Sequence, residues 1–186
     1  MDYDAPGRHC FQTTYLNERW REYLDPSLNF RMVWTLRNPH SVVYSMVHNW
    51  RRFALNEVFL ACGFAHMDAR DRVRFQRFGI WGIPPVRRAA YAYVGKLAQL
   101  EPLAQALGNR LTVVEYDRLV ARKSDVLPQL YERLNLRYQP HYVDGVSDRS
   151  VRKQDMLRQG DRAEIAVRCD GAYRQACSLL NLGTSS

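Results

Sequence analysis

The sequence predicts an α/β domain, in which helices flank a parallel sheet. Residues 30–36 form a run dense in apolar, β-branched and aromatic side chains that leads directly into an amphipathic helical segment. A second strand-like run occupies 110–115, and apolar residues at helical spacing fill 86–107 before it. The chain has 186 residues, of which 46% are apolar and 12% aromatic, so we expect one domain, 1–186, with a substantial core.

The junction between the first strand and its helix carries the main functional signal. Arg37 ends the apolar run, Asn38 can cap a helix, and Pro39 suits the first helical turn, where a missing N–H costs nothing. An arginine beside a helix N-terminus can hold an anion, because its guanidinium and the free backbone N–H groups converge on one point. The alternative is that Arg37 makes an ordinary surface ion pair.

Helical segments and loops alternate along the first half of the chain. Residues 11–24 predict a helix, and the charged stretch 64–78 predicts a solvated helix or connection. Glycine and proline punctuate the loop 78–85, in which Trp81 either contacts a substrate or packs into the core. The long helix expected over 86–107 ends at Gly108.

The second half is predicted to be mainly helical after the strand 110–115. A short helix is expected over 124–134 with Ser124 as its cap, followed by a loop over 139–150. A last helix opens with Asp161 and Glu164, whose spacing matches a capping box.

The net charge of +8 rests on 24 Arg and 3 Lys against 19 acidic residues. Such an excess favours anionic partners: nucleotides, phosphorylated or sulfated substrates, nucleic acid or a membrane surface. The arginines are scattered, and the sequence has no zinc-finger spacing, aromatic RNA-binding signature or heptad repeat. A basic nucleic-acid-binding protein is therefore kept as an alternative and not as the first choice.

The four cysteines have no spacing typical of a metal site, and we expect no metal. Reduced, partly buried thiols are the preferred interpretation, although four cysteines could also form two bridges in three ways: Cys10, Cys62, Cys169 and Cys177. Charged residues interrupt the N-terminus, so no signal peptide is expected, and no apolar run has the ~18 residues that a membrane span requires. We therefore expect a soluble, cytoplasmic protein.

Two segments resemble sulfotransferases that use 3′-phosphoadenosine 5′-phosphosulfate (PAPS). Arg37-x-Pro39 followed by Ser45, after an apolar strand and at a helix start, resembles the motif whose arginine and serine hold the 3′-phosphate of the nucleotide. Residues 116–119, Tyr-Asp-Arg-Leu, resemble the family's Tyr-Glu-Asp-Leu segment, although Asp-Arg replaces Glu-Asp. The resemblance covers the chain from about residue 11 to the end and implies roles for Arg37, Ser45 and Tyr116 in nucleotide binding. For Asp117, the favoured interpretation is an acid that caps the next helix.

The match at the basic C-terminal loop is positional. Arg149, Arg152 and Lys153 fall where the resembling enzymes close a basic loop over the 3′-phosphate, but Gln154 follows where their Arg-Lys-Gly sequence would have glycine. A solvated charge cluster is the alternative. His9 could correspond to the general base that some members carry upstream of the motif, although a polar surface histidine is the favoured interpretation.

One expected part of the family pattern is missing. The loop that holds the 5′-phosphosulfate in such enzymes precedes the first motif, but no Gly-rich or Lys-Ser/Thr loop precedes Arg37, and the first lysine is Lys96. Two strands also do not normally make an independent sheet, so either weaker strands exist, for instance near 138–143, or the fold's first strand is lacking. The second possibility explains both absences, and we expect an N-terminally truncated member.

The resemblance implies transfer of a sulfuryl group from PAPS, as co-substrate, to a hydroxyl or amine acceptor. The sequence assigns no catalytic base. A non-catalytic nucleotide-binding or scaffold domain of the same fold remains the second interpretation, and the nucleic-acid-binding protein remains the third.

Overall fold

The computed structural model describes residue 21, residues 30–148 and residues 151–180. Within these ranges two strands, β1 (Met32–Leu36) and β2 (Leu111–Glu115), form a parallel sheet in which Leu36 pairs with Glu115. Both strands were predicted from the sequence, and their parallel pairing confirms a general α/β class with a mostly helical chain. Apart from residue 21, the helix expected over 11–24 lies outside the described residues, as do His9 and Cys10.

Helices make up most of the structure between the two strands and after them. Before β2 the chain forms α2 (Pro39–His48), α3 (Arg52–Val58), the π-helix η1 (Phe59–Gly63), the 3-10 helix η2 (Phe64–His66), α4 (Ala69–Phe78), η3 (Gly79–Gly82), α5 (Pro85–Leu97), α6 (Leu100–Leu107) and η4 (Gly108–Arg110). After β2 it forms α7 (Tyr116–Ala121), α8 (Lys123–Arg133), η5 (Pro140–Gly145), η6 (Val151–Met156) and α9 (Gln159–Cys177). In the described part of the chain, no helix is long and apolar enough to cross a membrane.

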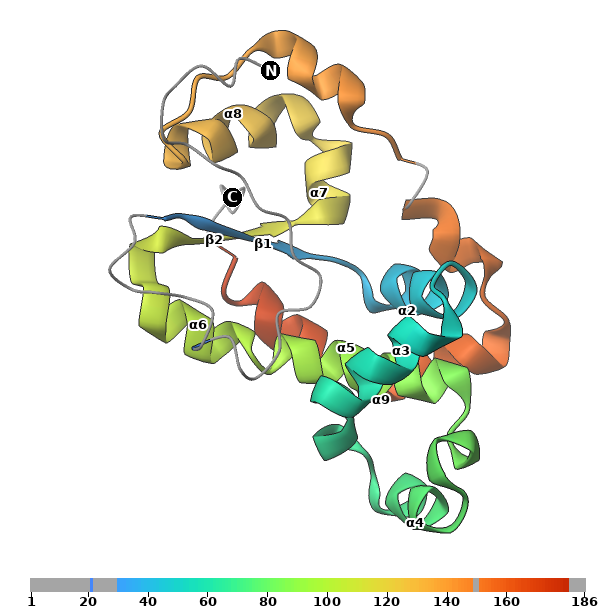
Figure 1. The fold of residues 1–186 in the computed structure, drawn as a ribbon. Helices are drawn as coiled ribbons and strands as arrows, with labels where there is room; N and C mark the ends of the chain where they lie inside the picture. The colour runs from blue at the N-terminus through green and yellow to red at the C-terminus, as the bar shows by residue number, and fades with distance from the viewer. Residues whose placement is uncertain (1–20, 22–29, 149–150, 181–186) are drawn as a thin grey trace.

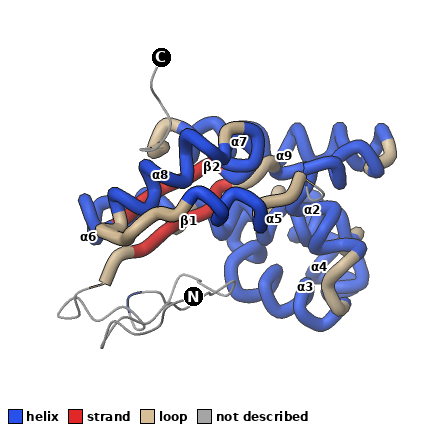
Figure 2. Tube along the Cα trace, turned by 90° about the horizontal axis from the view of Figure 1, so that it is seen from above, coloured by secondary structure: helices blue, strands red, loops and turns tan. Residues whose placement is uncertain are grey.

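The sheet lies between two helical layers (Figure 1). Helices α5, α6 and α9 cover one face, where the larger core includes Leu36, Leu111 and Ile165. Helices α7 and α8 cover the other face over β2, around a smaller core with Val114 and Leu127 (Figure 2). Each layer therefore buries an apolar face that neither the sheet nor the helices could bury alone.

Strand β1 is covered on one face only, although so dense an apolar run is typical of a strand with both faces buried. Its burial alternates, with Leu36 buried while Val33 is 37% exposed and Thr35 is exposed. Helices α7 and α8 follow β2 directly and pack over it, so they leave the outer face of β1 open. Strand β2 is buried at four of its five positions.

The long helix expected over 86–107 is two helices in the structure. Helix α5 ends at Leu97, and α6 begins at Leu100 with Pro102 in its first turn. Proline has no N–H to donate to the carbonyl four residues earlier, so a continuous helix would lose a hydrogen bond there, whereas the first turn of a new helix loses none.

Two predicted helix caps are also wrong. Helix α8 begins at Lys123, so Ser124 lies inside it, and no side chain caps this helix. Helix α9 begins at Gln159 rather than at the capping-box pair, and Glu164 forms ion pairs with Arg87 and Arg168. The segment near 138–143, where a weak strand was considered, begins the 3-10 helix η5.

Helix α5 passes through the middle of the helical layer and lies very close to η1. A Cβ atom built on Gly95 would lie 1.8 Å from the carbonyl oxygen of Cys62, and one on Gly63 would lie 2.6 Å from the backbone nitrogen of Ala92. The two segments can approach this closely only because both positions are glycine. Beyond this crossing, α4 and η3 extend away from the sheet (Figures 1 and 2).

Candidate nucleotide site

The carboxyl ends of β1 and β2 lie side by side and bring two predicted site residues together. Because Leu36 pairs with Glu115, the next residues of the two strands, Arg37 and Tyr116, are neighbours. The Cζ atom of Arg37 lies 4.5 Å from the ring centroid of Tyr116, which is a cation–π contact. The carboxyl edge of parallel strands is also where open α/β sheets bind ligands.

Helix α2 begins directly at this edge. The side chain of Asn38 caps the helix by accepting a 2.9 Å hydrogen bond from the backbone N–H of His40, as the sequence predicted, and Pro39 occupies the first turn. Tyr93 of α5 holds the junction between β1 and α2 in place, because its hydroxyl donates a 2.7 Å hydrogen bond to the carbonyl oxygen of Arg37. No feature of the sequence singled out Tyr93 for this role, since Tyr91 on the same helix is an equally buried tyrosine two residues earlier.

Asp117 faces the same junction. Burial raises the pKa of its carboxyl group, although the nearby positive charge of Arg37 and a hydrogen bond from the Asn38 backbone oppose the rise. No side chain caps α7, so Asp117 is not the helix cap that the sequence suggested. It instead places a carboxyl group beside the Arg37 guanidinium.

The remaining predicted residues are arranged around α2. Ser45 is half-buried on this helix, and its hydroxyl oxygen accepts a 3.2 Å hydrogen bond from Asn49. The segment η6, which contains Arg152 and Lys153, packs against α2 (Figure 1). The Arg152 side chain is 77% exposed and forms a 2.6 Å ion pair with Asp148, whereas the Lys153 side chain and Arg149 lie outside what the structure describes.

Three further expectations concern Trp81, a metal site and the cysteines. Trp81 lies on η3, which packs against α4 rather than at the sheet edge; it is 70% exposed, so it is not a core residue. Among the described residues, no group of three or more His, Cys, Asp or Glu side chains could hold a metal ion. Cys62, Cys169 and Cys177 are free thiols, and burial raises the pKa of Cys169 to about 12, so this thiol stays protonated.

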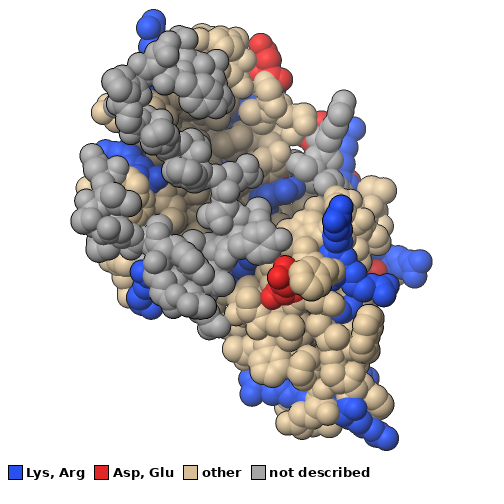
Figure 3. Space-filling view, in the orientation of Figure 1, with Lys and Arg blue, Asp and Glu red and all other residues tan. Residues whose placement is uncertain are grey.

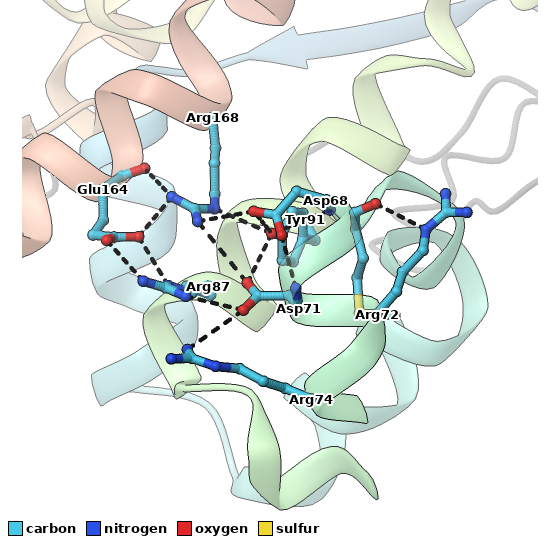
Figure 4. Close-up of polar contacts among 9 residues, drawn as sticks. Asp68, Asp71, Arg72, Arg74, Arg87, Tyr91, Glu164 and Arg168 are labelled. Carbon is cyan, nitrogen blue, oxygen red and sulfur yellow. Dashed lines mark hydrogen bonds and ion pairs between the residues drawn. The ribbon is translucent and has the colours of Figure 1, made fainter. Parts of the chain in front are cut away.

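The structure also contains a network of charges that the sequence did not predict (Figure 4). It joins α4, α5 and α9 around Asp71, whose side chain is fully buried. Arg87 lies 2.9 Å from Asp71 and 2.9 Å from Glu164, and Arg168 contacts Glu164 at 2.6 Å. The hydroxyl of Tyr91 lies 2.8 Å from a carboxylate oxygen of Asp71, so the central acid has several donors.

The pKa shifts in this network have clear causes. A hydrogen bond from Arg87 lowers the pKa of Glu164. Burial acts to raise the pKa of Asp68, but hydrogen bonds from the Asp71 backbone and from Tyr91, together with the charge of Arg168, outweigh it and lower the pKa. Burial raises the pKa of Tyr91 to about 12, which keeps its hydroxyl a donor. Because each acid has a basic or hydroxyl partner, we interpret the network as a link between three helices and not as a reactive site.

No protein-family model, curated protein or solved structure matches this chain. The chemistry of the described residues therefore carries the functional argument.

Proposed function

We propose that the chain binds a 3′-phosphorylated adenine nucleotide at the carboxyl edge of β1 and β2, and that the associated activity is sulfuryl transfer from PAPS to a hydroxyl or amine. The observation that carries the proposal is the contact of Arg37 with Tyr116 at the start of α2. A guanidinium held beside a helix N-terminus suits a dianionic phosphate, because it supplies charge and paired donors where the helix dipole is positive. The sulfotransferase-type fold is part of this proposal.

Each residue has a defined role in the proposed site. Arg37 would donate to two oxygens of the 3′-phosphate, and its contact with Tyr116 would hold the guanidinium in one orientation. Ser45 would donate a hydroxyl hydrogen bond to the same phosphate while its oxygen continues to accept from Asn49. Arg152 and Lys153 would approach from η6, which already packs against α2.

Sulfuryl transfer places further demands on the site. The acceptor oxygen or nitrogen attacks sulfur, the bond from sulfur to the 5′-phosphate oxygen breaks, and adenosine 3′,5′-bisphosphate leaves. A base must take the proton of the acceptor, and cationic or N–H groups must stabilise the charge on the leaving phosphate. The donor set of the described residues fits the 3′-phosphate, and no residue is assigned to either of these two tasks.

A non-catalytic nucleotide-binding domain is the second candidate. The observation that favours it is that the described donor groups suit a 3′-phosphate, while no residue is assigned to the acceptor's proton or to the leaving phosphate. A nucleic-acid-binding function receives less support, because the Lys and Arg side chains on the face in Figure 3 lie in several separate places.

Calorimetric titration with adenosine 3′,5′-bisphosphate, and with adenosine 5′-monophosphate as the control ligand, tests the site. The bisphosphate should bind more tightly, and Arg37→Ala or Ser45→Ala should remove most of that advantage. Loss of a charge-assisted hydrogen bond to phosphate costs about 1.5–3 kcal/mol, which is roughly ten- to a hundredfold in affinity. Arg70→Ala is the matched control, since it removes the same charge from an exposed position on α4.

The outcomes separate the candidates. Equal weakening of both ligands by Arg37→Ala would show that the 3′-phosphate assignment is wrong. Release of adenosine 3′,5′-bisphosphate from PAPS in the presence of hydroxyl and amine acceptors would support the enzyme, whereas binding without release would support the non-catalytic domain. Salt-sensitive binding of RNA or DNA that the bisphosphate does not displace would support the third candidate.

A further inference from the structure

A second arginine of α5 is buried without an acidic partner. Arg88 is 3% exposed, and its Nη1 donates to the side-chain oxygen of Asn56 on α3. Its Nε is also buried, and no residue in the described ranges forms a hydrogen bond with it. In the described part of the chain, no Asp or Glu forms an ion pair with this guanidinium, and an arginine cannot shed its charge by losing a proton.

The neighbouring residue, Arg87, differs from Arg88 because it is paired with acids. Arg87 is also on α5, and two carboxylates neutralise it, Asp71 and Glu164, each at 2.9 Å. Arg88 is more deeply buried than Arg87 and has neither. A buried charge without a counter-charge is strongly unfavourable. An anion bound next to Arg88 would offset this cost, and the described residues do not supply one.

A second positive charge, Arg52, lies on α3 one helical turn before Asn56, the residue that Arg88 contacts. Burial lowers the pKa of Arg88, and the charge of Arg52 on α3 lowers it further. Arg52 is exposed, and its Cζ lies 5.8 Å from the ring centroid of Trp81, which is itself 70% exposed. The arrangement is therefore a buried guanidinium, an exposed guanidinium beside it, and an exposed aromatic face next to the second.

We propose that Arg88, Arg52 and the Asn56 amide of α3 bind the oxyanion group of a small molecule, and that Trp81 contacts a flat apolar part of the same ligand. Two guanidiniums and one amide supply charge and directed donors, which is the combination that recognises phosphate, sulfate and carboxylate groups. The exposed ring of Trp81 beside Arg52 adds affinity for an apolar or aromatic substituent. This site does not depend on the proposed nucleotide site, because it uses different residues.

The test compares anions at equal ionic strength. The melting temperature of the chain is measured in sodium chloride, sodium phosphate, sodium sulfate and sodium acetate, and dissociation constants are measured by calorimetry. We expect at least one oxyanion to raise the melting temperature above its value in chloride, and phenyl phosphate to bind more tightly than inorganic phosphate. The three oxyanions distinguish a tetrahedral group from a carboxylate.

The variants assign the effect to the site. Arg88→Met keeps the length of the side chain and removes the charge, and it should raise the dissociation constant at least tenfold while leaving stability in chloride equal to or higher than that of the parent. Arg52→Ala, at an exposed position, should weaken binding without unfolding the chain. Arg37→Ala should retain the response to the anion, which separates this site from the nucleotide site, and Arg122→Ala is the control for loss of one exposed positive charge.

Three results would overturn the proposal. In the first, none of the three oxyanions raises the melting temperature above the value measured in chloride. Another is an unchanged oxyanion response in both Arg88→Met and Arg52→Ala. The last is a dissociation constant that Arg37→Ala raises as much as the two site variants do, because the anion would then bind at the sheet edge.

Discussion

Replacement of Asp71 by asparagine tests whether the charge network holds α4 against α5 and α9. Asp71 is fully buried, accepts a hydrogen bond from Arg87 at 2.9 Å and lies 2.8 Å from the hydroxyl of Tyr91. Asparagine keeps the size of the side chain but retains one accepting oxygen in place of two, and it has no charge.

The expected cost follows from the contacts that are lost. A hydrogen bond between charged groups contributes about 1.5–3 kcal/mol, and removal of one partner of a buried ion pair costs about 3–5 kcal/mol. Arg87 keeps Glu164 as a partner, at 2.9 Å, so its charge is not left unpaired and the lower part of this range applies. We therefore expect Asp71→Asn to lower the free energy of unfolding by about 3 kcal/mol, which corresponds to roughly 6–12 °C in melting temperature for a chain of this size.

Urea unfolding followed by circular dichroism measures the change, with Asp125→Asn as the control. Asp125 pairs with Arg122 at 3.1 Å, but both side chains are more than half exposed, at 56% and 53%. Its loss should cost less than about 1 kcal/mol. A cost for Asp71→Asn no larger than that of the control would refute the reasoning, because the buried network would then contribute no more than a surface pair.

Three other predictions concern pH, the nucleotide site and packing. The pKa of Glu164 is below its ordinary value of 4.5, so the stability difference between the parent and Glu164→Gln should be constant above about pH 5 and shrink as the pH falls through the folded pKa; a difference that grows on acidification would contradict this. Asp117→Asn should tighten binding of adenosine 3′,5′-bisphosphate about fivefold by calorimetry, because the carboxylate beside Arg37 repels phosphate; weaker binding would mean that Asp117 orients the arginine. Gly95→Ala should prevent folding, because its Cβ would lie 1.8 Å from a backbone oxygen, whereas Gly171→Ala in open space should be neutral or stabilising by up to about 1 kcal/mol in thermal unfolding.

The local features of the candidate nucleotide site were predictable from the sequence. Hydrophobic patterning identified both strands, and residues adjacent in sequence determine the Asn38 cap and the position of Pro39. The contact between Arg37 and Tyr116 then follows from the parallel pairing, because residues after paired strand ends are neighbours. The contacts of Tyr93 and Asp117 with this junction depend on how α5 and α7 pack, and no short pattern encodes them.

The two arginines 87 and 88 show why the rest was not predictable. They are adjacent on one helix, and the sequence presents them as an undifferentiated basic pair, yet helical geometry turns successive residues about 100° apart. Arg87 therefore faces Asp71 and Glu164, and Glu164 is 77 residues away in the sequence, while Arg88 faces Asn56 and Arg52 on α3. Whether an arginine is paired is thus decided by which helices pack against its side of α5.

Because Arg87 is paired with acids and Arg88 is not, replacing each by methionine should affect the stability of the chain differently. Arg87→Met would leave the buried Asp71 without its closest cation and should destabilise the chain in every buffer. Arg88→Met removes a charge that no described acid neutralises, so its stability relative to the parent should depend on the anion present, being equal or higher in chloride and lower in a buffer containing the bound oxyanion. If the stability relative to the parent changes sign between the two buffers for Arg88→Met but not for Arg87→Met, an anion that binds the folded chain explains it. The two variants have the same substitution on the same helix, so neither side-chain length nor helix propensity accounts for the difference.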